Sequence, residues 1–384
     1  NIALYAGKAL DLLAYGLASR GKIDSAALWC DSAYKLLSRF GHTKEALSTQ
    51  SNLAYYYHQQ GRIVEAISLN TALAETFARL HDLKLLYYTY NNLAGIYTEI
   101  GLQDSAAIFY KKALHIADSL GEPALKATTL NNLSTLYETQ NFVKEAQAYA
   151  REALRLRLAL KDSVHISHTY SNIARLYQRQ GQLDSAYIYY RKGYEIAQAA
   201  GYPIGLATTA SNLGALFAQQ GRWDSAHHYY EQALRLRQQG PPTERFKAYR
   251  GQVNLYLRWA EKNPPQRANL LSRAYYWSQK AQALLDTSPS VYDIDAVMNF
   301  YMDAHHVYAL LGLWRQAYDA LQKYQVYRDS LINQKAARKA LESHYQYQWQ
   351  NHERALREAM LKQQIEAQEA QKRQRLWIAF LAIL

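Results

Sequence analysis

Asparagine recurs with a period of 40 at one position of this sequence, and side-chain amides at such a spacing could hold the backbone of a peptide. The series lies nine positions before each expected turn and comprises Asn52, Asn92, Asn132, Asn172 and Asn212, with Asn254 after a longer interval. Asparagine is a mediocre helix former, so its recurrence within a helical pattern needs a cause. Its amide both donates and accepts hydrogen bonds. It could therefore bond to a neighbouring helix or to a bound peptide, and both roles stay open.

Five other side chains fall near this series, because residues three, four or seven positions apart share one face of a helix. They are Tyr55, His58, His168, Arg175 and Arg179. The two arginines would suit an acidic or carboxylate-bearing ligand. Together with the six asparagines, these residues form the candidate ligand groove.

Sequence motifs that carry catalysis are absent. The chain has no glycine-rich phosphate loop, no His-Glu-x-x-His and no Gly-x-Ser-x-Gly. The triplet His352-Glu353-Arg354 faintly resembles the phospho-acceptor box of sensor kinases, but the Asn/Thr-Pro that follows in such kinases is missing. We therefore expect no catalytic residue within these 384 residues.

Metal sites and disulfides are not expected either. Cys30 is the only cysteine, so there is neither a disulfide framework nor a two-cysteine metal site. Histidines occur in close pairs without a third ligand nearby in the sequence, which favours surface or groove positions over metal binding. The pairs are His165 with His168, His227 with His228, and His305 with His306. No cofactor is implied.

The elements that must position the asparagines are repeated helices. Self-similarity at a fixed period decides the architecture of a chain. The expected turns share the period of the asparagines and lie at Gly21, Gly61, Gly101, Asn141, Gly181 and Gly221. Before each turn, apolar residues follow the period of an amphipathic helix, as in Leu130, Leu133, Leu136 and Tyr137.

A second helix follows each turn and opens with a carboxylate, which favours the positive end of the helix dipole. The acidic residues are Asp24, Glu65, Asp104, Glu145, Asp184 and Asp224. Small residues recur in register where the two helices cross: Ala54, Ala94, Ser134, Ala174 and Gly214 in the first helix, and Ala26, Ala66, Ala106, Ala146, Ala186 and Ala226 in the second. Aromatic side chains fill the space between them: Tyr57, Tyr97, Tyr137, Tyr177 and Phe217.

The order of these residues resembles the tetratricopeptide repeat: Leu-small-x-x-aromatic, a glycine, an alanine, a late aromatic such as Tyr190, and a small residue such as Gly193. The resemblance covers residues 3–335 and departs from the family in its period of 40 instead of 34, as in kinesin light chains and some bacterial regulators. It implies an all-α fold, a right-handed α-solenoid of about eight helix pairs over residues 1–335. The asparagine series is similar to the ladder of O-GlcNAc transferase-type repeats, whose inner surface holds extended peptides.

The C-terminal part of the sequence predicts a different organisation. No glycine follows Gly312 and no proline follows Pro289, so Trp314–Leu384 could form one helix roughly 100 Å long. We expect residues 336–375 to form a helical or coiled-coil linker. Residues 376–384 carry no charge and follow a basic cluster that includes Arg373 and Arg375, so we expect them to begin a transmembrane helix.

The net charge of +12 raises the possibility of nucleic-acid binding. The basic residues mostly lie on the second helices among Glu and Gln, with no zinc spacing or RNA-binding aromatic motif beside them. A solvated helix face accounts for this pattern better, so nucleic acid is not an expected partner.

Three classes of function compete. The organisation resembles the sensory region of bacterial tetratricopeptide-repeat sensor histidine kinases, or of LuxR-type regulators, which would bind a peptide or protein ligand in the groove and relay it through the C-terminal helix. A membrane-tethered scaffold for protein complexes is the alternative, and an enzyme is the third class. The resemblance favours an extracytoplasmic, periplasmic array, whereas the basic cluster before residue 376 favours a cytoplasmic one. The long helix could also pair two chains into a homodimer.

Overall fold

The computed structural model describes residues 2–20, 22–287 and 294–330, together with the single positions 358, 362 and 372. The chain divides into two compact units, Asn1–Leu331 and Ile332–Leu384. The expected linker, apart from those single positions, and the expected membrane segment, 376–384, lie outside the described residues. Within the described residues every regular element is helical, as the sequence predicts.

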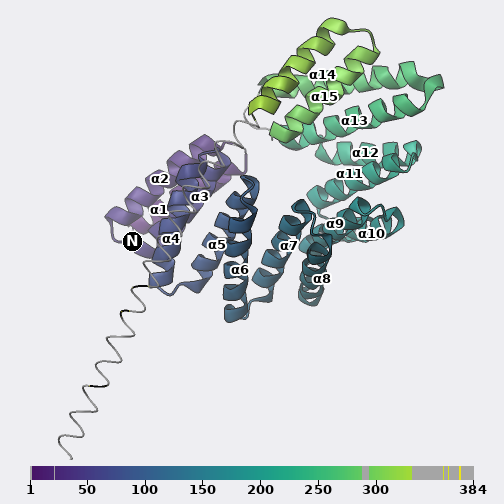
Figure 1. Ribbon diagram of the computed structural model, residues 1–384. Helices are drawn as coiled ribbons and strands as arrows, with labels where there is room; N and C mark the ends of the chain where they lie inside the picture. Colours follow the sequence, from purple (N-terminus) through teal and green to yellow (C-terminus); the bar gives the residue numbers. More distant parts are fainter. Residues whose placement is uncertain are drawn as a thin grey trace, which may run out of the picture. The chain divides into compact units, whose positions relative to one another are not determined.

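The helices of the first unit are arranged in pairs that follow one another along the chain (Figure 1). The first helices of the pairs are α1 (Ile2–Ala18), α3 (Thr43–Gln59), α5 (Leu83–Glu99), α7 (Pro123–Thr139), α9 (Ser163–Arg179), α11 (Pro203–Gln219), α13 (Pro242–Lys262) and α15 (Ile294–Leu310). The second helices are α2 (Ile23–Arg39), α4 (Ile63–Arg79), α6 (Gln103–Leu120), α8 (Val143–Leu160), α10 (Leu183–Ala199), α12 (Trp223–Arg237) and α14 (Arg267–Thr287). A short 3₁₀ helix, η1 (Pro264–Gln266), precedes α14, and a helix over 314–330 completes the eighth pair.

The period of the sequence is also the period of the structure. From α3 to α11 the first helices begin at a constant interval, which equals the spacing of the asparagines, and the second helices from α2 to α12 do the same. In each pair from α3 and α4 to α11 and α12, the turn between the two helices has a residue in the left-handed region, which favours glycine. The predicted turn residues Gly61, Gly101, Asn141, Gly181 and Gly221 have φ angles of 65° to 82°. The predicted turns in the described part of the chain are therefore confirmed.

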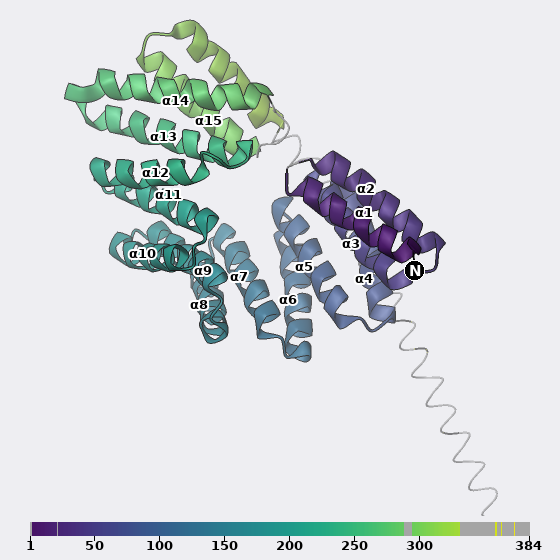
Figure 2. The ribbon, with the colours of Figure 1, turned by 180° about the vertical axis from the view of Figure 1, so that it is seen from behind.

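Small and aromatic residues pack the two helices of each pair against each other. The predicted small residues lie in the core, and Ala174 and Ala186, for example, are fully buried. In four successive pairs, the aromatic residue near the end of the first helix stacks on a ring of the second helix, with centroids 5.3 to 5.5 Å apart. The stacked pairs are Tyr97 with Phe109, Tyr137 with Tyr149, Tyr177 with Tyr189, and Phe217 with Tyr229. Seen from behind, the helix pairs keep the same order (Figure 2).

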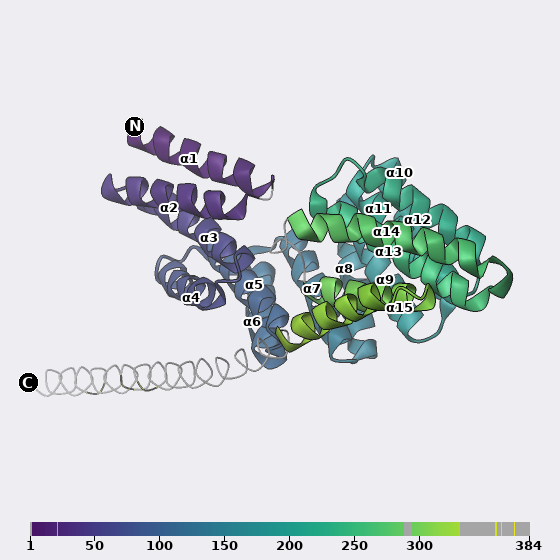
Figure 3. The ribbon, with the colours of Figure 1, turned by 90° about the horizontal axis from the view of Figure 1, so that it is seen from above.

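The first helices of successive pairs contact each other all along the array, from α1 and α3 to α13 and α15. They therefore form a shared surface, called here the first-helix face, on which the predicted groove residues lie. Figure 3 shows the start of the array from above, where α1, α2 and α3 follow one another. None of the helices in the described part of the chain combines the length and the apolar character needed to cross a membrane.

Candidate functional site

Three of the five asparagines that keep the period of 40 connect neighbouring first helices. The side-chain amide of Asn132 donates to Oδ1 of Asn91 at 3.3 Å, and that of Asn172 donates to Oδ1 of Asn131 at 2.9 Å. Asn52 donates to both carboxylate oxygens of Asp11, at 3.2 and 3.0 Å. In each case the acceptor lies 41 positions before the donor. These asparagines therefore help to hold successive helix pairs in register.

The asparagines at positions 92 and 212 behave differently. The corresponding residues of the preceding repeat, where an acceptor would lie, are Ser51 and Ser171. Serine is shorter than asparagine, and each serine hydroxyl bonds within its own helix, to the carbonyl of Leu47 at 3.2 Å or of Ser167 at 3.1 Å. Neither Asn92 nor Asn212 makes a side-chain hydrogen bond with any other described residue. Their amides are therefore available to a ligand, with one donor group and one acceptor each.

A cavity of about 470 Å³ opens on the first-helix face beside Asn92. The Asn92 cavity, as it is called below, is lined by residues of α3 to α7 and of α9, among them Tyr55, Tyr88, Asn92, Gly95, Asn132 and His165. His58 also lines it and lies 2.6 Å from a carboxylate oxygen of Glu99. Four of the predicted groove residues, Tyr55, His58, Asn92 and Asn132, thus converge on one cavity.

The absence of a side chain at Gly95 opens the floor of the Asn92 cavity. A Cβ atom placed on Gly95 would have only the Tyr110 hydroxyl within reach, at 4.0 Å. The same register position carries Tyr55 one repeat earlier and Thr135 one repeat later. Glycine at this position therefore leaves space that the neighbouring repeats fill.

The wall of the Asn92 cavity offers polar groups but contains no lysine or arginine among its described residues. Asn70 of α4 is 1% exposed, and its Oδ1 atom has no partner among the described residues. Tyr87 donates to the carbonyl of Leu125 at 2.8 Å and accepts from Asn91, also at 2.8 Å, and its burial raises the pKa of its hydroxyl to about 12. The rings of Tyr55 and Tyr88 are exposed. Neutral amides, hydroxyls and exposed rings suit the backbone and the uncharged side chains of a peptide.

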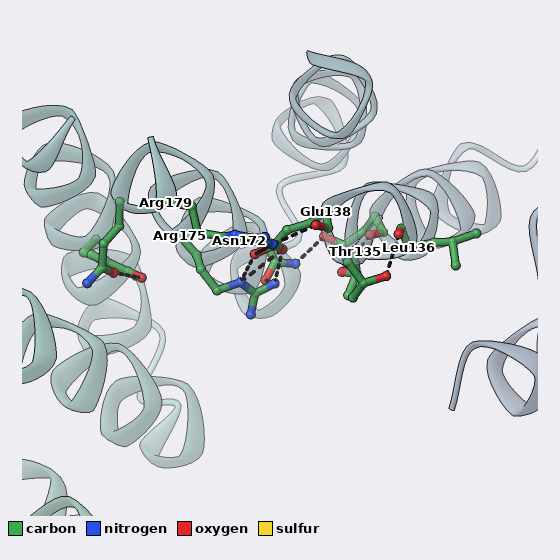
Figure 4. Close-up of polar contacts among 10 residues, drawn as sticks. Thr135, Leu136, Glu138, Asn172, Arg175 and Arg179 are labelled. Carbon is green, nitrogen blue, oxygen red and sulfur yellow. Dashed lines mark hydrogen bonds and ion pairs between the residues drawn. The ribbon is translucent and has the colours of Figure 1, made fainter. Parts of the chain in front are cut away.

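The predicted arginines lie elsewhere on the first-helix face and are already paired. Arg175 forms a bidentate contact with the carboxylate of Glu138 through hydrogen bonds of 2.7 and 2.8 Å (Figure 4). Arg179 donates to the backbone carbonyl of Glu138 at 2.7 Å and lies 3.7 Å from its carboxylate. Glu138 is 5% exposed and bridges α7 to α9. Glu138 therefore already supplies these two arginines with a carboxylate partner.

His168 contacts Tyr202, at 3.2 Å from Nε2 to the hydroxyl. Burial lowers the pKa of the His168 imidazole, and the nearby charges of His165 and Arg157 lower it further. His165 instead pairs with Asp162, whose carboxylate oxygen lies 2.7 Å from Nδ1 and whose other oxygen accepts from the backbone amide of His165. The described residues hold no group of three or more potential metal ligands.

A second cavity, of about 350 Å³, opens on the same face between α11, α12, α13 and α15. The Asn212 cavity, as it is called below, is lined by residues that include Asn212, Tyr230, Lys247, Arg250, Asn254 and Asp303. Asn254 donates to the carboxylate of Asp303 at 3.2 Å. Two more predicted residues, Asn212 and Asn254, thus belong to this cavity.

The cationic lining of the Asn212 cavity was not predicted from the sequence, and neither were Asn70, Tyr88 and Gly95 in the Asn92 cavity. A signal for both cavities was present in the sequence. The position three residues after the asparagine is Gly95 in the repeat of Asn92 and Ala215 in the repeat of Asn212. A repeat between these two carries Arg175 at the same position. The smallest residues at this position therefore mark the two cavities.

The chain is similar to known proteins both in its repeats and in its fold. Sequence models of the tetratricopeptide repeat match residues 87–119, 127–160 and 165–239. The apo form of RapI is similar to the chain with a TM-score of 0.55 at 18% identity, and the similarity covers 73% of this chain and 99% of RapI. No curated protein sequence matches the chain.

Two further solved structures share the architecture. One is the Rap conjugation regulator of plasmid pLS20 in complex with the Phr* peptide, with a TM-score of 0.54, 14% identity and coverage of 86% and 96% of the two chains. The other is a signal-transduction ATPase with a tetratricopeptide repeat sensor from Pyrococcus horikoshii, with a TM-score of 0.55, 16% identity and coverage of 86% of this chain. The similarity spans half of that ATPase chain. At these identities the likeness concerns the fold, and the repeat matches together with the paired helices show that this chain is a tetratricopeptide repeat protein.

Proposed function

We propose that the first unit is a non-catalytic protein-interaction region that binds an extended peptide or protein segment on its first-helix face, with the Asn92 cavity as a principal subsite. The observation that carries this proposal is the pair of asparagines without hydrogen-bond partners in the described residues, each beside a cavity. A peptide backbone presents alternating donors and acceptors, which is what a free side-chain amide can bind. The Rap regulator of similar fold, whose structure contains the Phr* peptide, is consistent with such a use.

The experiment compares two asparagines with different contacts. A peptide is first selected with the chain from a random dodecapeptide display library, and its affinity is measured by fluorescence anisotropy. We expect Asn92→Ala to weaken binding about tenfold, the effect of losing roughly 1.4 kcal/mol of hydrogen bonding, without lowering the melting temperature.

Asn172→Ala is the matched control for stability. Asn172 bonds to Asn131 and also accepts from Arg175 at 3.3 Å, so its removal should cost about 1–2 kcal/mol of folding free energy. Failure to select any peptide, or equal affinity of Asn92→Ala and the wild-type chain, would refute the proposed binding function.

We further propose that this region is the sensory part of a membrane-anchored signalling protein of the sensor histidine kinase type. The uncharged run 376–384 behind a basic cluster supports a membrane anchor, and the preceding residues without glycine or proline support a helical connection to it. A ligand that favours one arrangement of the helix pairs could bias such a connection. The alternatives are a membrane-tethered scaffold and the input region of a LuxR-type regulator.

A further inference from the structure

The Asn212 cavity differs from the Asn92 cavity in its charge. Three cationic side chains line it, Arg237, Lys247 and Arg250, against one carboxylate, Asp303. Within the described lining of the Asn92 cavity there is no lysine or arginine. The two cavities on the first-helix face therefore offer different chemistry to a ligand.

Two of the three cations already have an acidic partner. Glu244 accepts from Arg237 Nε at 2.9 Å and from Lys247 Nζ at 2.7 Å. Arg237 is 7% exposed and also donates to the hydroxyls of Ser211 and Thr208 in α11, at 2.6 and 3.2 Å. It is thus fixed in place as part of the cavity wall.

Arg250 differs from Arg237 and Lys247 in its contacts. It makes no hydrogen bond or ion pair with any described residue, although it lines the cavity and is half-buried. A guanidinium group carries five donors and stays charged at all physiological pH values. Its donors are therefore available to an anion that enters the cavity.

Tyr230 presents a second available donor. Its ring is held between α11 and α13, because a Cβ atom on Gly214 would come within 2.8 Å of the ring and one on Gly251 within 3.0 Å. The hydroxyl has no hydrogen-bond partner among the described residues. Burial raises the pKa of Tyr230 to about 12, so the hydroxyl keeps its proton and can donate it in a hydrogen bond.

The one carboxylate of the cavity, that of Asp303, lies near the positive charges of Arg258 and Arg250. Asn254 donates to Asp303, and burial raises the pKa of this carboxyl group above its ordinary value. The other two amides of the lining, those of Asn212 and Asn299, have no hydrogen-bond partner among the described residues. Donors thus outnumber acceptors among the available groups of the lining.

We propose that the Asn212 cavity is an oxyanion-binding site in which Arg250, Tyr230 and Asn212 donate to a carboxylate or phosphate group. The proposal rests on the proposed ligand-binding function for the molecule that carries this group, which would be an acidic or phosphorylated peptide. An acidic group of the ligand would then bind at α11 to α15. It would not need Arg175 and Arg179, whose charges are already neutralised by Glu138.

Small anions test the site directly. The chain is titrated in a calorimeter, at low ionic strength in a buffer free of phosphate and carboxylate, with inorganic phosphate and separately with N-acetyl-aspartate amide. The tighter of the two identifies the group that the site prefers. Absence of measurable binding for both anions would overturn the proposal.

Four variants separate a built site from general attraction to a basic chain. We expect Arg250→Met to raise Kd about tenfold and Tyr230→Phe to raise it several-fold, because each removes one donor. Asp303→Asn should lower Kd, since it removes the competing carboxylate. Arg191→Met is the control: it changes the net charge by the same amount, but Arg191 lies on α10, pairs with Glu195 at 2.8 Å and should leave Kd unchanged.

An equal effect of Arg250→Met and Arg191→Met would show diffuse electrostatic attraction and contradict the proposal. Tyr230→Phe and Asp303→Asn change few atoms, so they keep the test valid if Arg250→Met does not fold. The outcome is independent of the peptide selection. Anion binding with these variant effects but no selected peptide would refute only the proposed function, and the reverse result would refute only the oxyanion site.

Discussion

At the scale of single residues, the use of the five groove asparagines that keep the period of 40 is decided by one residue of the preceding repeat. Where this residue is Asp11, Asn91 or Asn131, its side chain reaches the amide and the asparagine joins two helices. Where it is serine, the amide has no partner in the described part of the chain. The period of the sequence reveals the asparagine series. Which asparagines join two helices and which lack a partner depends on contacts between repeats, which the period does not show.

The pairing of Arg175 with Glu138 could not be predicted in the same way. The two residues lie 37 positions apart, which is not the repeat period, and Glu138 has no acidic counterpart in the neighbouring repeats. From the sequence, Arg175 and Arg179 are therefore expected to be unpaired cations in the groove. Whether they also contact a ligand stays a prediction, because both side chains are still more than two-fifths exposed.

Gly95 gives a prediction at this scale. Gly95→Thr introduces the residue that the next repeat carries at this position, Thr135, into space where a Cβ atom meets only the Tyr110 hydroxyl at 4.0 Å. We expect the free energy of unfolding to stay within about 0.5 kcal/mol of the wild type, because the Cβ atom has open space and threonine forms helix slightly better than glycine. The affinity for a selected peptide should fall about tenfold as the cavity is filled.

Urea unfolding and fluorescence anisotropy measure the two effects of Gly95→Thr separately. Ala215→Thr, in the Asn212 cavity, is a companion variant that fills the other site. A Gly95→Thr variant that binds the peptide as tightly as the wild-type chain would show that the Asn92 cavity is not used.

At the scale of helices, one set of turns is predictable from the sequence and the other is not. The turns within the pairs carry glycine or asparagine at each described position. The turns between the pairs use a left-handed residue as well, at Gly41, His81, Gly121, Lys161 and Gly201. Residues other than glycine are uncommon at positive φ, so His81 and Lys161 interrupt the signal of the second series in the sequence. The helix boundaries nevertheless follow, because each helix extends between two turns.

The contact of α11 with α13 through Tyr230 gives a prediction at this scale. In Gly214→Ala the new methyl group would lie 2.8 Å from the Tyr230 ring, which Gly251 confines on its other side. We expect a loss of about 1–3 kcal/mol in the free energy of unfolding from overpacking, in spite of the better helix propensity of alanine.

Gly16→Ala is the matched control, since Gly16 lies within α1 and a Cβ atom there would meet nothing within 4 Å. It should raise the free energy of unfolding by up to about 1 kcal/mol. Urea unfolding of both variants checks the prediction. A Gly214→Ala variant as stable as Gly16→Ala would mean that Tyr230 is free to move.

At the scale of the whole molecule, the repeated motif, which loses its period of 40 in the last pairs, predicted about eight helix pairs and the all-helical class, and both are confirmed for the described residues. Periodicity predicts the fold because each pair buries its apolar face against its neighbours, so one repeat specifies the next. It says nothing of the ligand, whose chemistry depends on residues that break the period, such as Gly95 and Arg250. The two proposed ligand sites thus depend on exceptions to the repeat.

The proposed membrane anchor leaves the compartment of the array to be determined at the scale of the whole molecule, and a buried thiol allows it to be measured. Cys30 is fully buried and donates to the carbonyl of Thr49, and burial raises its pKa, so the wild-type array should not react with a membrane-impermeant maleimide. Lys35→Cys places a second thiol on α2 where the lysine side chain is 72% exposed, at the loss of a surface ion pair with Asp31 that contributes little to stability. In intact cells that express the full-length protein, an extracytoplasmic array should be labelled at position 35 before lysis. Labelling only after lysis would place the array in the cytoplasm, and a ligand for the two cavities would then have to be a cytoplasmic peptide.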